Sequence, residues 1–222
     1  MSVLSIHLWK LLQLMYADRS LLISKLRADI RDDLKREKGS GSDGGDFHNA
    51  FWSDAKKHVL GEADLRDSVN IRIDKHKGRA RLYPDLRDGF LLWWEEKRRW
   101  RNEPLHLLQS PPHARMEISA LNAKVKVESM LAVGSQPDFQ RLVYPYFSEK
   151  PALSIEAVRV GLWTLHEALP KTYELSELRI LDLLRGQSYA LEDVGFDGDE
   201  SQLFLRRYGA VIELWNELKK EY

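Results

Sequence analysis

The most distinctive chemistry in this sequence is carried by a basic and aromatic segment, Trp93–Arg101, which reads Trp-Trp-Glu-Glu-Lys-Arg-Arg-Trp-Arg. Interleaved arginines and aromatic rings can hold nucleic acid, because guanidinium groups bind phosphates and ring faces stack on unpaired bases. The spacing favours an ordinary alternative, in which Glu95 pairs with Arg98 or Arg99 along a helix whose tryptophans fill the core. The candidate binding residues are Arg79, Arg81, Trp94, Lys97, Arg98, Arg99 and Arg101.

A second candidate site consists of carboxylates in the second half of the chain, at Glu117, Glu128 and Asp182. Carboxylates that converge with a lysine at a sheet edge can hold a divalent metal and polarise the attacking water, as in a metal-dependent hydrolase or nuclease. Lys124 and Lys126 are near enough in sequence to join such a site. The alternation that places Lys124, Lys126 and Glu128 on one strand face is, however, also that of an ordinary solvated strand.

Other motifs give no catalytic or cofactor prediction. Asp54 and His58 stand four residues apart, with His48 just before them, but no His-x-x-x-His pair occurs, so we interpret Asp54 and His58 as a surface pair rather than metal ligands. The segment 39–44 has the spelling of a dinucleotide fingerprint, but a charged helical pattern precedes it where a buried strand is required. No nucleophile elbow follows a predicted strand. We therefore expect no metal and no cofactor.

Composition limits the class of protein. The 222 residues include no cysteine, which excludes disulfides, thiolate metal sites and a cysteine nucleophile and favours the cytoplasm. The N-terminus does not have the pattern of a signal peptide, and no stretch is long enough or apolar enough to span a membrane. The formal net charge is zero, which argues against a surface built wholly for nucleic acid. Residues 64–101 hold eleven Lys and Arg against seven Asp and Glu, whereas residues 149–222 hold nine against fourteen, and this charge asymmetry indicates a polar partner.

The first half of the chain has helical periodicity. Apolar residues recur at three-and-four spacing over 5–38, which predicts one long amphipathic helix, and residues 39–46 have the Gly and Ser composition of a linker. Further helices are predicted to contain Phe51 and Trp52, to begin at Asp64, and to run from Asp85 to about Arg101. The alternation over 69–73 leaves a strand there as an alternative.

The pattern changes from helical to alternating near 109–113, the best internal boundary. Strands are predicted at 121–127 and 142–147, and Pro145 indicates an edge position for the second of them. Ser154 should cap a helix, residues 178–191 should form a hairpin, and Asp197 or Asp199 should cap the last helix, whose apolar residues step four, three, four, three, four. These apolar residues are Phe204, Tyr208, Val211, Trp215, Leu218 and Tyr222.

We therefore predict an α+β fold with a helical N-terminal half and a small, mostly antiparallel sheet in the C-terminal half with two packed helices. The expected organisation is an N-terminal helix at 1–38, a linker at 39–46 and a globular domain at 47–222 with a sub-boundary near 109–113. A helix followed by a glycine-rich tether can dock on another protein or on a second copy of the chain. The resulting hypothesis is a non-catalytic cytoplasmic binding or assembly protein, with a protein partner favoured over nucleic acid and a metal-dependent hydrolase or nuclease as the alternative.

Overall fold

A computed structural model describes residues 3–39, 47–97, 106–107, 111–135 and 139–222. The α+β class is confirmed: the described first half is mostly helical, and every described strand except β1 and β2 lies in the second half, together with helices. The strands form two sheets rather than one: sheet A has the order β1-β4-β3 and sheet B the order β2-β5-β6-β7-β8. Within the described residues, four of the six strand pairings are antiparallel, and β1 with β4 and β6 with β7 are parallel.

The N-terminal segment is not the single helix that its periodicity predicts. It consists of β1 (Ser5–His7), α1 (Leu8–Tyr16) and α2 (Arg19–Glu37). The helices separate at Ala17 because Asp18 caps α2, its carboxylate accepting a hydrogen bond of 2.9 Å from the Leu21 amide. Pairing with Lys124–Lys126 fixes Ser5–His7 as a strand. The predicted linker that follows, apart from Gly39, lies outside the described residues.

Three helices follow, α3 (Phe47–Val59), α4 (Leu65–Lys75) and α5 (Tyr83–Leu91), with a 3₁₀ turn, η2 (Lys77–Arg81), before α5. Asp64 caps α4 as predicted, and the alternative strand at 69–73 is wrong. The third helix begins at Tyr83, two residues before the predicted cap Asp85, with Pro84 in its first turn, and it continues as a π-helical turn, η3 (Leu92–Lys97).

Sheet A contains β1, β3 (Ala114–Ile118) and β4 (Ala123–Val127), and η4 (Ser119–Leu121) joins the last two. The alternation predicted for β4 is confirmed, with Ala123, Val125 and Val127 buried and the lysines between them partly exposed. The first half of the chain supplies the outer strand β1, so residues 5–16 share one core with the C-terminal half.

Sheet B contains β2 (His106–Leu107), β5 (Leu131–Ser135), β6 (Phe139–Tyr146), β7 (Leu178–Asp182) and β8 (Gln187–Tyr189). The predicted hairpin is β7 and β8, joined through η6 (Leu183–Arg185). The prediction that β6 lies at an edge is wrong, because β6 lies between β5 and β7. Its pairing with β5 ends at Val143, so Pro145 has a neighbouring strand on one side only and its missing N–H breaks no ladder there.

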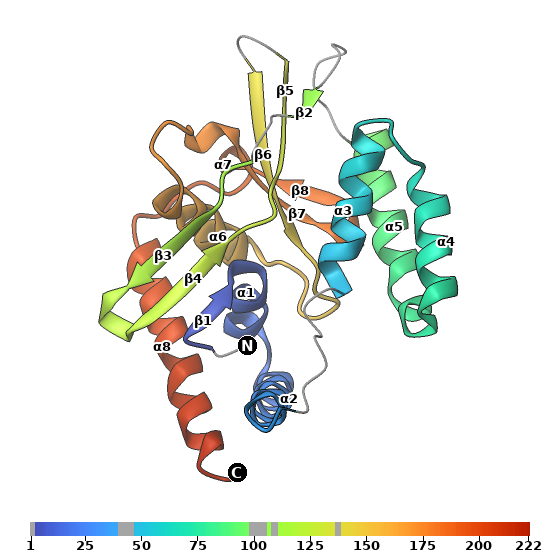
Figure 1. The fold of residues 1–222 in the computed structure, drawn as a ribbon. Coiled ribbons are helices and arrows are strands. Elements are labelled where there is room, and N and C mark those ends of the chain that lie inside the picture. The colour runs from blue at the N-terminus through green and yellow to red at the C-terminus, as the bar shows by residue number, and fades with distance from the viewer. Residues whose placement is uncertain (1–2, 40–46, 98–105, 108–110, 136–138) are drawn as a thin grey trace.

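The remaining helices are α6 (Ile155–Ala168), the short α7 (Leu191–Val194) and α8 (Glu200–Lys219), and η5 (Leu175–Glu177) precedes β7. Ser154 caps α6 as predicted, accepting a hydrogen bond from the Ala157 amide. Both faces of sheet B are covered: Tyr144 belongs to a core shared with α1, α6 and α8, and Val143 to a second core shared with α3, α4 and α5 (Figure 1). Among the described residues, no helix is both long and apolar enough to cross a lipid bilayer.

Candidate binding groove

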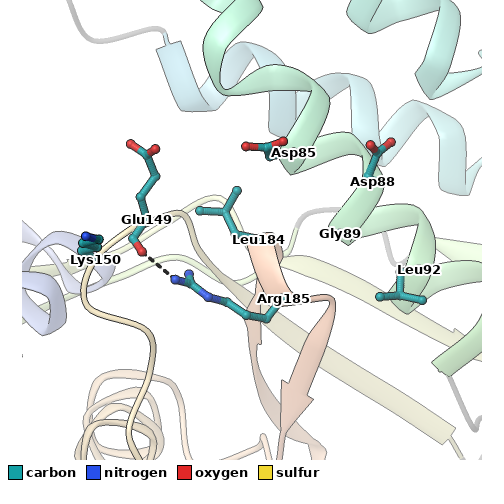
Figure 2. Close-up of a pocket in the computed structure, with 8 residues that line it drawn as sticks. All are labelled: Asp85, Asp88, Gly89, Leu92, Glu149, Lys150, Leu184 and Arg185. Atoms are coloured by element: carbon teal, nitrogen blue, oxygen red, sulfur yellow. Dashed lines mark hydrogen bonds between the residues drawn. The ribbon is translucent and has the colours of Figure 1, made fainter.

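A groove of about 540 Å³ lies where α5 meets the loop after β6 and the turn between β7 and β8. We call it the α5 groove. Figure 2 shows that its walls come from three segments far apart in the sequence. The lining residues are Asp85, Asp88, Gly89 and Leu92 from α5 and η3, Glu149 and Lys150 from the loop, and Leu184 and Arg185 from η6.

At Gly89, which lines the α5 groove, two backbones approach each other closely. A β-carbon added to Gly89 would lie 1.9 Å from the carbonyl oxygen of Leu183, and one added to Gly186 would lie 2.6 Å from the carbonyl oxygen of Gly89. Gly186 also has a φ of +55°, which favours glycine. Helix and turn can meet at this distance only because neither position carries a side chain.

Arg185 fixes the loop wall of the groove. Its Nη1 donates to the Ser148 carbonyl oxygen at 2.7 Å, and its Nη2 donates to the Glu149 carbonyl oxygen at 2.5 Å (Figure 2). The same Nη1 lies 3.2 Å from the Asp182 carboxylate. One guanidinium therefore joins the end of β7 to the loop that follows β6, which holds the groove in shape without a ligand.

Asp182 lies beneath this wall and is 1% exposed. Burial raises the pKa of its carboxyl group, while Arg185 and the Leu153 amide, which donates at 3.4 Å, act in the opposite direction. The sequence offered Asp182 as a catalytic candidate, but its carboxylate is directed into these internal contacts. Its observed contacts are with groups that position the loop.

Two of the predicted binding residues lie at the rim of the α5 groove. Arg81 forms a bidentate pair with Glu149, at 2.6 and 2.7 Å, and this hydrogen bonding lowers the pKa of the Glu149 carboxyl group. Lys97 Nζ lies 3.4 Å from the Arg185 carbonyl oxygen. Both cations therefore have partners within the chain.

The other described members of the predicted basic surface have internal contacts as well. The Arg79 guanidinium lies over the Tyr83 ring, 5.4 Å from its centroid, and Trp94 stacks on Phe90 at 6.4 Å between centroids. Glu95 pairs with Arg66 across to α4. Arg98, Arg99 and Arg101 lie outside the described residues, so the structure does not address their role or their pairing with Glu95.

The catalytic candidates of the sequence are not brought together. Glu117 on β3 pairs with Lys124 at 2.7 Å, and Glu128, just after β4, lies 3.4 Å from Arg115. Glu117 belongs to sheet A and Glu128 directly follows its strand β4, whereas Asp182 ends β7 of sheet B. The part of the chain that the structure covers contains no group of three His, Asp or Glu side chains that could hold a metal ion.

The residues considered as weak metal ligands have other partners. Asp54 is buried and pairs with Arg72, at 2.7 Å to Nε and 3.0 Å to Nη2, so the predicted surface pair with His58 is wrong. His58 Nδ1 instead accepts from the Leu65 amide at 3.3 Å. His48 stacks on Phe147 at 4.7 Å between centroids, and burial lowers its pKa to about 4.

Sequence reasoning missed most of the α5 groove, including Asp85 as a wall residue, Asp88, Glu149, Lys150 and Arg185. The signal that could have indicated it is the pair of glycines, Gly89 within a helix and Gly186 directly after Arg185. A glycine inside a helix is less stable than an alanine there, so its presence can indicate that another backbone lies too close for a side chain. Nothing local could have shown that these two glycines meet.

Three comparisons, with models of protein families, with curated proteins and with solved structures, found no match for this chain. The functional argument therefore rests on the α5 groove and on the positions of the charged side chains around it.

Proposed function

We propose that this chain is a non-catalytic binding or assembly protein of the cytoplasm, and that its α5 groove receives a basic segment of a partner protein. The cytoplasmic location is supported by the absence of cysteine from the 222 residues. The protein partner is supported by the charges of the groove. The non-catalytic role is supported by the separation of the candidate carboxylates.

The observation that carries the proposal is the acidic wall that α5 gives to a preformed groove. Asp85 and Asp88 are exposed on α5, and Asp88 lies 2.7 Å from Arg87. Across the groove, Glu149 is bound by Arg81, and Arg185 is committed to the loop carbonyls. The two carboxylates of α5 therefore carry the argument, because they repel the phosphates of nucleic acid and attract lysine or arginine side chains.

The separation of the carboxylates favours binding over hydrolysis. A metal-dependent hydrolase needs several carboxylates around one ion, and Glu117 and Glu128 each have a cation of sheet A close by. Asp182 is buried beneath Arg185. The metal-dependent alternative therefore lacks support from the described part of the chain.

The N-terminal segment contributes less to partner docking than its periodicity suggests. The apolar residues of α1 lie in the core, and α2 directs Leu26 and Ile30 into the same core. The exposed residues of α2 are mostly charged, such as Arg31 and Asp32. The α5 groove is therefore the better supported docking site.

The proposal can be tested by selecting peptides on the purified chain from a display library of random short sequences. The expected result is enrichment of peptides rich in lysine or arginine. Their affinity should fall about tenfold or more when both acidic residues of α5 are neutralised, because two exposed charge pairs are removed. The variant is Asp85→Asn with Asp88→Asn.

A matched control is Glu213→Gln with Glu217→Gln, which removes two exposed negative charges from α8, away from the groove lining. Peptides that bind this control as tightly as the original chain locate the effect at the α5 groove. An equal loss of peptide affinity in both double variants would show a non-specific effect of net charge and would refute the groove as the binding site.

A further inference from the structure

The outer edge of sheet A is a surface that the proposed function does not use. β3 is the last strand of the order β1-β4-β3 and pairs with β4 through all five of its residues. Within the described residues no strand pairs with its other side. An edge strand presents N–H and C=O groups that can pair with another chain.

This edge has few of the features that prevent such pairing. The register with β4 runs without a bulge from Ala114 to Ile118, and the prolines Pro111 and Pro112 come before the strand. Every residue of β3 therefore has an N–H group. The charged side chains Arg115 and Glu117 point to the outer face, each 64% exposed, so neither blocks the edge by pointing inward.

The charge order of β3 selects one partner and one register. In antiparallel pairing with a second copy about a twofold axis through Met116, Arg115 lies opposite Glu117 of the second copy, and the reverse. Centring the pairing on Arg115 or on Glu117 would place identical charges opposite each other. Opposite charges directly across strands stabilise pairing, and identical charges destabilise it.

Within its own chain, Arg115 has one carboxylate partner and lies directly opposite a like charge. In the register of β3 with β4, Arg115 lies opposite Lys126, a like charge, and its nearest carboxylate is the diagonal Glu128 at 3.4 Å. Glu117 lies opposite Lys124, with which it pairs at 2.7 Å. A carboxylate on the open side of Arg115 would offset the repulsion by Lys126.

We propose that two copies of this chain associate through β3, in antiparallel register about Met116, to join their A sheets into one. The contact is short and its two ion pairs are exposed, so the dimer is weak and dissociates as salt increases. This association is independent of the α5 groove, and none of its residues lines that groove.

Sedimentation velocity over a range of chain concentrations tests the proposal with two single variants. Arg115→Glu and Glu117→Arg each place like charges opposite each other in the homodimer, so each should lower the association constant about tenfold or more. An equimolar mixture of the two variants restores both opposite pairs and should associate like the original chain. Thermal unfolding of each variant checks that it is folded.

A chain that stays monomeric at the highest concentration would overturn the proposal. It would also be overturned by single variants that associate as the original chain does, or by a mixture no more associated than its components. The groove variant with Asp85→Asn and Asp88→Asn should dimerise normally, which keeps this outcome separate from a failure of the proposed function.

A cross-linking experiment gives a second, independent readout. The chain has no cysteine, so Met116→Cys creates a single thiol that faces its own copy across the twofold axis. Oxidation with diamide should link most of this variant as dimers at concentrations where Ser201→Cys, exposed on α8, stays largely monomeric. Equal cross-linking of the two variants would refute pairing at β3.

Discussion

Gly89 and Leu183 are in backbone contact: a β-carbon on Gly89 would lie 1.9 Å from the Leu183 carbonyl oxygen. This contact joins a helix of the first half of the chain to the turn between two strands of the second half, and Gly89 lines the α5 groove. The stability of the fold and the shape of the candidate site therefore depend on the same few backbone atoms.

Gly89→Ala should destabilise the protein, by about 1–3 kcal/mol in urea unfolding, because the new methyl group has no room beside Leu183. The sign of the change in unfolding free energy is diagnostic, since replacing glycine by alanine inside an unobstructed helix would stabilise the protein by up to about 1 kcal/mol. Gly78→Ala is the control, because a β-carbon there meets no atom within 4 Å. An unfolding free energy for Gly89→Ala at or above that of the original chain would contradict the close contact.

Arg185→Met should destabilise the protein by about 3 kcal/mol at neutral pH, because it leaves the buried Asp182 carboxylate without its cation. Adding Asp182→Asn should recover part of this loss, since no buried charge then remains. The pKa of Asp182 is raised, so its protonated form is favoured in the fold and the penalty for its charge decreases as the pH falls through that pKa.

Urea unfolding of Arg185→Met at neutral and at acidic pH checks this prediction. The destabilisation relative to the original chain should be smaller at acidic pH. A loss that is independent of pH, and that Asp182→Asn does not reduce, would show that Arg185 acts only through the loop carbonyls.

His48 should make folding sensitive to acid. Its pKa is lowered to about 4 by burial against Phe147 and Trp9, with Lys10 and Lys25 acting in the same direction. Because the folded-state pKa lies below the unfolded value of about 6.5, the stabilisation is complete above about pH 6.5 and is lost as the pH falls towards 4. The titration of His48 should lower the unfolding free energy by about 2–3 kcal/mol over that pH interval.

His48→Phe keeps an aromatic ring in the cluster and removes the titrating group. Its unfolding free energy, measured by urea titration across this pH interval, should fall less steeply than that of the original chain. The same slope in both proteins would show that the acid sensitivity comes from other groups.

Nucleic acid should bind weakly at physiological salt, with a Kd no lower than about 10⁻⁶ M. Two described cations of the predicted basic surface are engaged, Arg81 with Glu149 and Lys97 with the Arg185 carbonyl, and the α5 groove is lined by more carboxylates than cations. Fluorescence anisotropy with labelled single- and double-stranded DNA and RNA at two salt concentrations measures this. Tight, salt-sensitive binding that is lost in a folded Arg98→Ala, Arg99→Ala and Arg101→Ala variant would make nucleic acid the leading partner.

The sequence by itself determined the α+β class and the elements that depend on local chemistry. Asp64 and Ser154 cap helices as their side chains predict, and the alternation of Ala123 to Val127 gives a strand. These features need only neighbours within a few residues, because a capping side chain bonds the next turn and a period of two places alternate residues on opposite faces.

The contacts between segments that are distant in the sequence were decided by the tertiary structure alone. Residues 5–7 become a strand because Lys124–Lys126 lies beside them, and Asp54 pairs with Arg72 rather than with His58. Pro145 is tolerated in a central strand because the pairing of β6 with β5 stops at Val143. The α5 groove brings together segments around 85–92, 149–150 and 184–185. Such contacts are set by long-range strand pairing and helix packing, which periodicity along one segment does not encode.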